Sequence, residues 1–209
     1  MILQSLAFIF TFLESLFIYK VLTVPSYDGK HIPVRPARIL MIWLQLVLIS
    51  VVSVHMFPFG TAAVIIAQQM ILIMTGYIDR HTSYIWRTMS FPCMMLGMLY
   101  LIIQSCIRRE YMLPLFAAIY AGLFLLTGIL KMWGMGDVYV TIGVSLTLMG
   151  ILPLANAIAY VPIFVVFSGL CFLVCNIRKG IRTKSPYAPY MNVGFTLTFL
   201  CMLAQGVSV

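Results

Sequence analysis

Two aspartates are the side chains of this sequence best suited to carry out chemistry. Asp79 directly follows one apolar stretch, and Asp137 directly precedes another. Two carboxyl groups about 3 Å apart share one proton, so one can act as a general base while the other acts as a general acid. Such a pair can activate water and hydrolyse an amide bond without a covalent intermediate. The pH dependence would then belong to the pair rather than to either aspartate.

Two glycines come just before the second aspartate, in the run Gly134-Met135-Gly136-Asp137. Glycine lets two backbones approach closely and allows a positive φ, which we expect here because the chain turns into a helix. Without side chains in the way, an extended substrate strand would have room to lie against this segment. The alternative is that these glycines serve only the packing or entry of a helix.

The composition excludes most classes of soluble protein. Of the 209 residues, 63% are hydrophobic and 9% are charged, whereas about a quarter of the residues of a soluble domain are charged. Disordered chains, coiled coils and nucleic-acid-binding modules need far more charge, so we expect no nucleic-acid partner. The sequence therefore predicts an all-α integral membrane protein whose surroundings are the lipid bilayer.

Hydropathy and helix breakers predict a polytopic bundle of about eight transmembrane helices in a single domain, residues 1–209. About 20 apolar residues are needed to cross a bilayer. The predicted spans cover residues 2–21, 39–56, 61–78, 89–107, 111–130, 138–152, 155–177 and 191–207.

The basic residues are distributed unequally over the loops between these spans. Eleven of the 13 Lys and Arg residues fall in loops on one side, and only Arg108 and Arg109 fall on the other. Short basic loops stay in the cytoplasm, so both termini are predicted to be extracytoplasmic. Asp79 and Asp137 are 58 residues apart in the chain, yet both would lie at the cytoplasmic face.

Another candidate segment is the stretch PYAPY at residues 186–190, where the last cytoplasmic loop re-enters the membrane. Its prolines would make this entry stiff and irregular. Tyr187 and Tyr190 are candidates for contact with a substrate, or else for an aromatic belt at the membrane interface. Glu14 lies in the middle of the first span, where it would contact a substrate or be a protonated acid bonded to a neighbouring helix.

These segments together resemble the type IV prepilin peptidases, which are bacterial membrane aspartyl proteases with a Gly-x-Gly-Asp motif. Ile85 follows Asp79 at the spacing where the family has Ile-Pro, but Trp86 replaces the proline. Tyr139 stands where the family usually has a lysine after the second aspartate. The resemblance covers residues 61–209, which would form the catalytic core.

The resemblance also implies roles for individual residues. Asp79 and Asp137 would be the catalytic pair. The backbone of the substrate cleft would come from five further positions: Gly134, Gly136, Pro186, Pro189 and Gly194. The substrates would be prepilins or pseudopilins, whose leader peptide is cut at the cytoplasmic face of the bacterial plasma membrane during assembly of a pilus or competence pseudopilus.

One departure from the family concerns the loop at residues 20–38. Many members carry two Cys-x-x-Cys pairs there and methylate the new N-terminus, whereas this loop is short and has no cysteine. It cannot hold a zinc domain, and we expect no metal site. Peptidase activity is thus the firmer implication, and S-adenosylmethionine would be a cofactor only if methylation were retained. The oligomeric state stays open.

Two other functions remain as alternatives. A presenilin-type or signal-peptide-peptidase-type protease also carries Gly-x-Gly-Asp, but it needs a Pro-Ala-Leu segment that this sequence lacks. A transporter could use the same two aspartates to bind a proton or a cation. Such a transporter predicts charges nearer the middle of the membrane and an internal inverted repeat.

Overall fold

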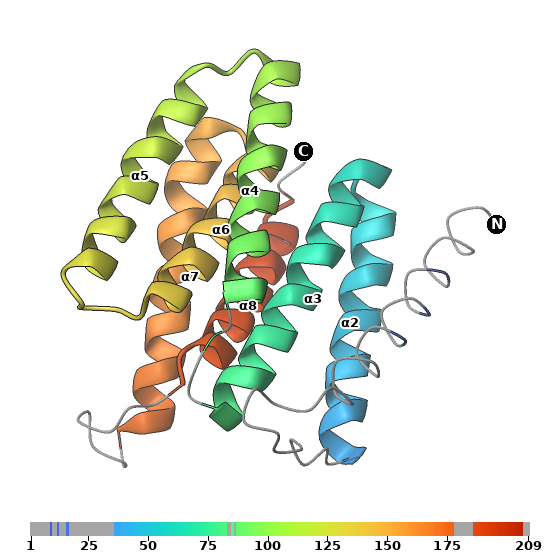
Figure 1. The fold of residues 1–209 in the computed structure, drawn as a ribbon. Helices are drawn as coiled ribbons and strands as arrows, with labels where there is room; N and C mark the ends of the chain where they lie inside the picture. The colour runs from blue at the N-terminus through green and yellow to red at the C-terminus, as the bar shows by residue number, and fades with distance from the viewer. Residues whose placement is uncertain are drawn as a thin grey trace. The chain divides into compact units, whose positions relative to one another are not determined.

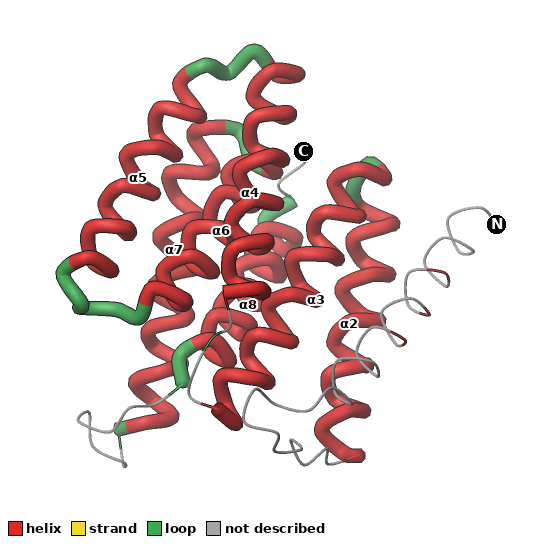
Figure 2. Tube along the Cα trace, viewed as in Figure 1, coloured by secondary structure: helices red, strands yellow, loops and turns green. Residues whose placement is uncertain are grey.

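The computed structural model of the chain describes residues 36–82, 85, 87–177 and 186–206, together with Ile9, Phe12 and Leu16. These residues form helices joined by short connections, and no strand occurs among them (Figures 1 and 2). The chain divides into two compact units, Met1–Met74 and Thr75–Val209. The two predicted catalytic aspartates both belong to the second unit.

Seven of the eight predicted helices are present in the described part of the chain. They are α2 (Pro36–Met56), α3 (Phe59–Thr82), α4 (Arg87–Arg108), α5 (Met112–Ile129), α6 (Met135–Ile151), α7 (Leu154–Asn176) and α8 (Ala188–Ala204). The predicted first span, including Glu14, lies outside the described residues except for three helical positions, and so does the loop up to residue 35.

The helix ends nearest the two aspartates differ from the prediction by three or four residues, because hydropathy gives little weight to the polar residues and glycines at helix termini. Helix α3 continues past Asp79 to Thr82, and α8 begins at Ala188 instead of residue 191. Helix α6 begins at Met135 rather than at residue 138, since the Val138 N–H already donates to the Gly134 carbonyl oxygen at 3.0 Å. Asp137 therefore lies inside the first turn of α6 rather than before it.

Four helices of the described residues are long and apolar enough to cross a membrane. They are Phe59–Arg80, Arg87–Arg108, Met112–Ile129 and Leu154–Asn176. The apolar helices Leu40–Met56, Met135–Ile151 and Ala188–Ala204 are shorter. A helix of 17 residues, such as α6, measures about 26 Å at 1.5 Å per residue, against a hydrocarbon core of about 30 Å.

The outer face of α5 shows why this protein needs a lipid environment. Leu115, Ile119, Leu123 and Leu126 lie three or four residues apart on this helix, and each is at least half exposed. Exposing such a face to water would be costly. The exposed apolar face therefore agrees with a helical membrane protein.

The first unit contains a helical hairpin made by α2 and the first part of α3. Phe57 and Pro58 form the turn between them, and the Phe57 N–H donates to the Ser53 carbonyl oxygen at 3.0 Å. Leu46 on α2 and Ile73 on α3 are both buried in one small apolar cluster. This contact between distant points of the chain holds the hairpin together.

Helix α6 is the centre of the second unit, enclosed by α4, α5 and α7 (Figure 1). Its residues from Val138 onward are buried, apart from the half-buried Tyr139. At its far end, Arg108 Nη2 donates to the Ile151 carbonyl oxygen at 2.9 Å. Consecutive helices from α4 to α8 run antiparallel, so α6 and α8 begin at the end of the unit where α7 ends.

The crossing of α4 and α6 depends on two glycines that face each other. A Cβ atom on Gly143 would lie 2.5 Å from the carbonyl oxygen of Cys93, and one on Gly97 would overlap the carbonyl oxygen of Gly143. Nearby, the Cys93 thiol donates a weak hydrogen bond to the Val140 carbonyl oxygen at 3.8 Å. The two backbones therefore touch, which fixes the position of α6 along α4.

We predict that Gly143→Ala lowers the free energy of unfolding by about 1–3 kcal/mol, because the new methyl group must push two backbones apart. Gly122→Ala in α5 is the matched control, since a Cβ there meets nothing within 4 Å and alanine favours a helix by about 1 kcal/mol. Thermal unfolding in detergent micelles measures both. Equal melting temperatures for the two variants would contradict the role of the crossing.

Candidate active site

Asp79 is held in place by the start of a helix that lies far away in the chain. Its side chain is only 4% exposed. Its Oδ2 atom accepts a hydrogen bond of 3.0 Å from the backbone N–H of Ala188, and the N–H of Tyr187 also interacts with this carboxylate. The first N–H groups of a helix have no partner within the helix and favour negative charge. The carboxylate of Asp79 thus joins the end of α3 to the start of α8.

A glycine makes this approach sterically feasible. Gly76 lies one turn before Asp79, and a Cβ atom there would lie 3.1 Å from the Cα of Pro189. Any larger residue would push α3 away from α8 and lengthen the hydrogen bond to Asp79. Neither Gly76 nor this contact follows from the sequence pattern, because a single glycine in an apolar helix has no distinctive signature.

Asp137 is fixed through its backbone, whereas its carboxyl group has no fixed partner. The Thr141 hydroxyl donates to the Asp137 carbonyl oxygen at 2.8 Å and also contacts the Met191 sulfur at 3.3 Å. The Oδ1 atom of Asp137 is buried and makes no hydrogen bond within the described part of the chain. An unpartnered carboxyl oxygen is costly, so Asp137 Oδ1 has an unused capacity to accept a hydrogen bond.

The two glycines of the Gly-x-Gly-Asp run are needed for space and not for a special backbone conformation. The prediction of a positive φ is wrong: Gly134 has φ −64° and ψ 136°, and Gly136 is not among the described residues with positive φ. A Cβ atom on Gly134 would lie 3.0 Å from Asp137 Oδ2, and one on Gly136 would lie 2.8 Å from Ile85 Cβ. Both glycines therefore make room beside the second aspartate.

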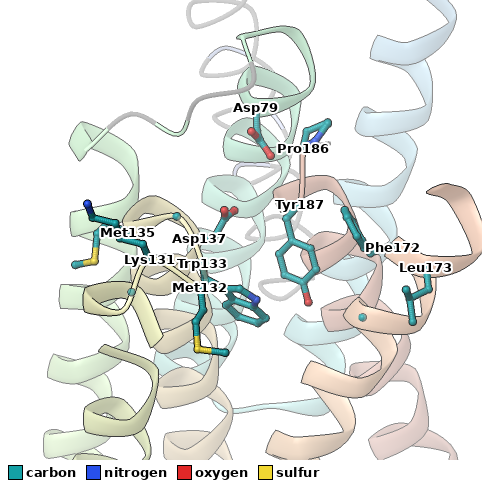
Figure 3. Close-up of a pocket in the computed structure, with 13 residues that line it drawn as sticks. Asp79, Lys131, Met132, Trp133, Met135, Asp137, Phe172, Leu173, Pro186 and Tyr187 are labelled. Carbon is teal, nitrogen blue, oxygen red and sulfur yellow. The ribbon is translucent and has the colours of Figure 1, made fainter. Parts of the chain in front are cut away.

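Asp79 and Asp137 line the same two cavities. The larger cavity has a volume of about 930 Å³ and the smaller about 290 Å³. Both are also lined by Gly134 and Met135. Figure 3 shows both carboxyl groups pointing into the larger cavity. The two carboxyl groups thus lie where the cavities adjoin, at the end of the second unit where α6 and α8 begin.

The structure separates the predicted residues of the C-terminal segment. Pro186 and Tyr187 line the larger cavity. Tyr190 does not line it, because its hydroxyl accepts a hydrogen bond of 3.1 Å from Asn176 Nδ2. Gly194 also lies elsewhere: a Cβ there would overlap the side chain of Ser168, so this glycine serves the packing of α8 on α7.

An aromatic wall of the larger cavity was not predicted. Its rings belong to Trp133, Phe172 and Tyr187. The ring centroids of Trp133 and Tyr187 are 5.2 Å apart, and those of Phe172 and Tyr187 are 5.4 Å apart. Trp133 directly precedes the glycine run, so its place beside the cavity could have been predicted from the sequence. Phe172 resembles the other phenylalanines of α7, so its sequence gives no signal.

Tyr187 remains protonated at neutral pH. Burial is the largest cause that raises the pKa of Tyr187 to about 12, and the nearby Asp137 carboxyl and Cys171 thiol act in the same direction. Its hydroxyl is therefore a hydrogen-bond donor throughout the physiological range.

The smaller cavity differs from the larger one in its lining residues. It is lined by the exposed Arg87, by Tyr139 and by Ile85 in addition to the residues shared with the larger cavity. Within the described residues, no group of three or more His, Cys, Asp or Glu side chains is arranged to hold a metal ion. The two carboxyl groups that line both cavities can exchange protons with a bound molecule.

Comparison of the chain with protein-family models, with curated proteins and with solved structures finds no match. The function of this site is therefore argued from its residues and geometry.

The two aspartates should respond differently to truncation. Asp79→Ala removes the acceptor for the Ala188 N–H, whereas Asp79→Asn keeps a carbonyl oxygen there. We expect Asp79→Ala to be less stable than Asp79→Asn by about 1–3 kcal/mol, the usual cost of a buried donor without a partner. Asp137→Ala and Asp137→Asn should differ little, because no hydrogen bond comparable to that of Asp79 is made by Asp137 Oδ1 among the described residues. Thermal unfolding of the four purified variants measures this, and a larger difference at Asp137 than at Asp79 would refute it.

Proposed function

We propose that this protein is a membrane aspartic endopeptidase that cleaves the leader peptides of type IV prepilins or pseudopilins. The observation that carries the proposal is the meeting of three separate segments at one cavity. Asp79, three residues of the Gly134–Asp137 run, and Pro186 and Tyr187 just before α8 all contribute to its lining. These are the segments whose sequences resemble the prepilin peptidases.

In hydrolysis, one carboxyl group can act as the general base and the other as the general acid. The ionised carboxyl takes a proton from water, whose oxygen then attacks the scissile carbonyl carbon. The protonated carboxyl gives its proton to the carbonyl oxygen, which produces a neutral tetrahedral diol. When the diol collapses, the C–N bond breaks and the departing amine takes the proton that the base received from water. One diol hydroxyl returns its proton to the other carboxyl group as the new carboxylic acid forms, so both aspartates regain their starting protonation states.

The substrate needs an extended backbone next to these carboxyl groups. Gly134 and Gly136 present no side chain, so a peptide strand can lie close to α6 at the position of Asp137. The larger cavity offers about 930 Å³, which is room for several residues of a peptide. Its aromatic wall suits apolar side chains.

The membrane arrangement that fits this function has eight spans with both termini outside the cytoplasm. Arg80, Arg87 and Lys131 are exposed and lie at the same end as the two aspartates. Basic residues stay on the cytoplasmic side of the bacterial plasma membrane, so the site faces the cytoplasm. The carboxyl groups lie near helix ends rather than in the middle of long spans, which suits hydrolysis better than ion transport.

The catalytic assignment predicts that Asp79→Asn and Asp137→Asn each lower leader cleavage by at least about 100-fold, because an amide can neither accept nor release the proton. Glu110→Gln is the matched control and keeps activity, since Glu110 follows α4 at the opposite end of the unit. The assay incubates detergent-solubilised protein with candidate pseudopilins and sequences the new N-terminus.

Retained cleavage in either aspartate variant would remove that residue from the mechanism. Proton-coupled uptake into vesicles that is lost in both variants, without cleavage by the native protein, would instead establish the transporter.

Reporter fusions test the orientation. Green fluorescent protein placed after Lys131 should fluoresce, because that loop is predicted to be cytoplasmic. Alkaline phosphatase at the C-terminus should be active, since it requires the oxidising outer compartment. Green fluorescent protein placed after Glu110 is the control and should stay dark. A fluorescent fusion at the C-terminus would exclude the eight-span arrangement.

A further inference from the structure

The hydroxyl of Tyr187 is a polar group in an otherwise aromatic wall and has no hydrogen-bond partner in the described part of the chain. Tyr187 is half-buried and lines the larger cavity. Its hydroxyl makes no hydrogen bond to any residue that the structure describes, although the ring is fixed on both sides. A fixed donor that opens into a cavity is available to a bound molecule.

The position of this hydroxyl separates it from the reacting bond. In Figure 3 the ring of Tyr187 extends away from the carboxyl groups of Asp79 and Asp137 and lies between the rings of Trp133 and Phe172. The backbone of Tyr187 faces Asp79, whereas its hydroxyl lies at the opposite end of the side chain. A peptide that reaches both must extend along the aromatic wall.

We propose that the Tyr187 hydroxyl donates a hydrogen bond to a backbone carbonyl of the bound peptide, on a residue next to the one that is cut. This inference rests on the proposed peptidase function and adds a substrate-binding residue to it. A carbonyl oxygen is the fitting partner because the hydroxyl stays protonated, and because every residue of an extended peptide presents a carbonyl. Tyr187 therefore holds the register of the peptide against the two carboxyl groups.

A neighbouring tyrosine provides a closely matched control. Tyr190 also contacts Phe172, with ring centroids 5.5 Å apart, but its hydroxyl is already bonded to Asn176. Tyr187→Phe and Tyr190→Phe each remove one hydroxyl and keep the ring. Only Tyr187→Phe removes a donor from the cavity. The same change in both variants would therefore indicate a general effect of losing a hydroxyl in this region.

The experiment measures cleavage of a synthetic prepilin leader peptide that spans the cut site, using the full chain in detergent micelles. We expect Tyr187→Phe to raise KM about three- to tenfold with little change in kcat, the effect of one lost hydrogen bond made equally before and during reaction. Tyr190→Phe should keep the KM of the native protein. Melting temperatures of both variants show whether they are folded.

A second measurement identifies the partner carbonyl. Peptides in which one carbonyl near the cut is replaced by a methylene group are compared on the native protein and on Tyr187→Phe. At one position the replacement should raise the KM of the native protein and leave that of the variant unchanged, because the same bond is already lost. Unchanged KM in Tyr187→Phe, or a fall in kcat alone, would overturn the inference. If the native protein cleaves no candidate substrate, the proposed function itself fails.

Discussion

The hydrogen bond from the Ala188 N–H to Asp79 is the interaction on which the site depends. It joins two helices that are 109 residues apart in the chain and places a carboxylate at the start of α8. A buried carboxylate is costly unless it is hydrogen-bonded, and the free N–H groups of a helix start are among the few donors that a helical protein can supply. Pro186 and Tyr187, the two described residues just before α8, are therefore part of the site and not merely a connection.

The second aspartate, Asp137, is positioned by close packing between helix backbones. Gly97 and Gly143 bring α4 and α6 into direct contact, and Gly134 and Gly136 keep the space around Asp137 clear. Membrane helices gain little from the hydrophobic effect against one another, so close approach at small residues is a main source of their association. In the second unit the glycines thus determine both where α6 lies and how much room its aspartate has.

The sequence was sufficient to predict the helices of the described residues, because apolar stretches stand out in a chain of this composition. It also singled out Asp79 and Asp137 as rare acidic residues at helix ends, and the structure places both in the lining of the same cavities. It could not distinguish Tyr187 from Tyr190, which lie three residues apart and near one helix face. Their difference comes from Asn176, whose side-chain amide donates a hydrogen bond to the hydroxyl of Tyr190 and not to that of Tyr187. The role of Phe172 in the aromatic wall could not be predicted either, because it depends on how closely α7 approaches Tyr187. The expected positive φ at the glycine run was wrong because the chain enters α6 through an extended Gly134, with φ −64° and ψ 136°. Glycine instead leaves space there for Ile85 and the Asp137 side chain.

The contrast between the two carboxyl groups has a consequence for how the pair assembles. Asp79 is anchored at its oxygen atom, while among the described residues Asp137 is anchored through its backbone and its Oδ1 has no hydrogen-bond partner. Rotation about the two side-chain torsions of Asp137 changes the gap between the carboxyl groups without displacing any helix. A Cβ atom on Gly134 would lie 3.0 Å from Asp137 Oδ2, so glycine at this position keeps space beside the carboxyl group. The distance between the two carboxyl groups can therefore adjust through one side chain, while the helices that carry them stay in place.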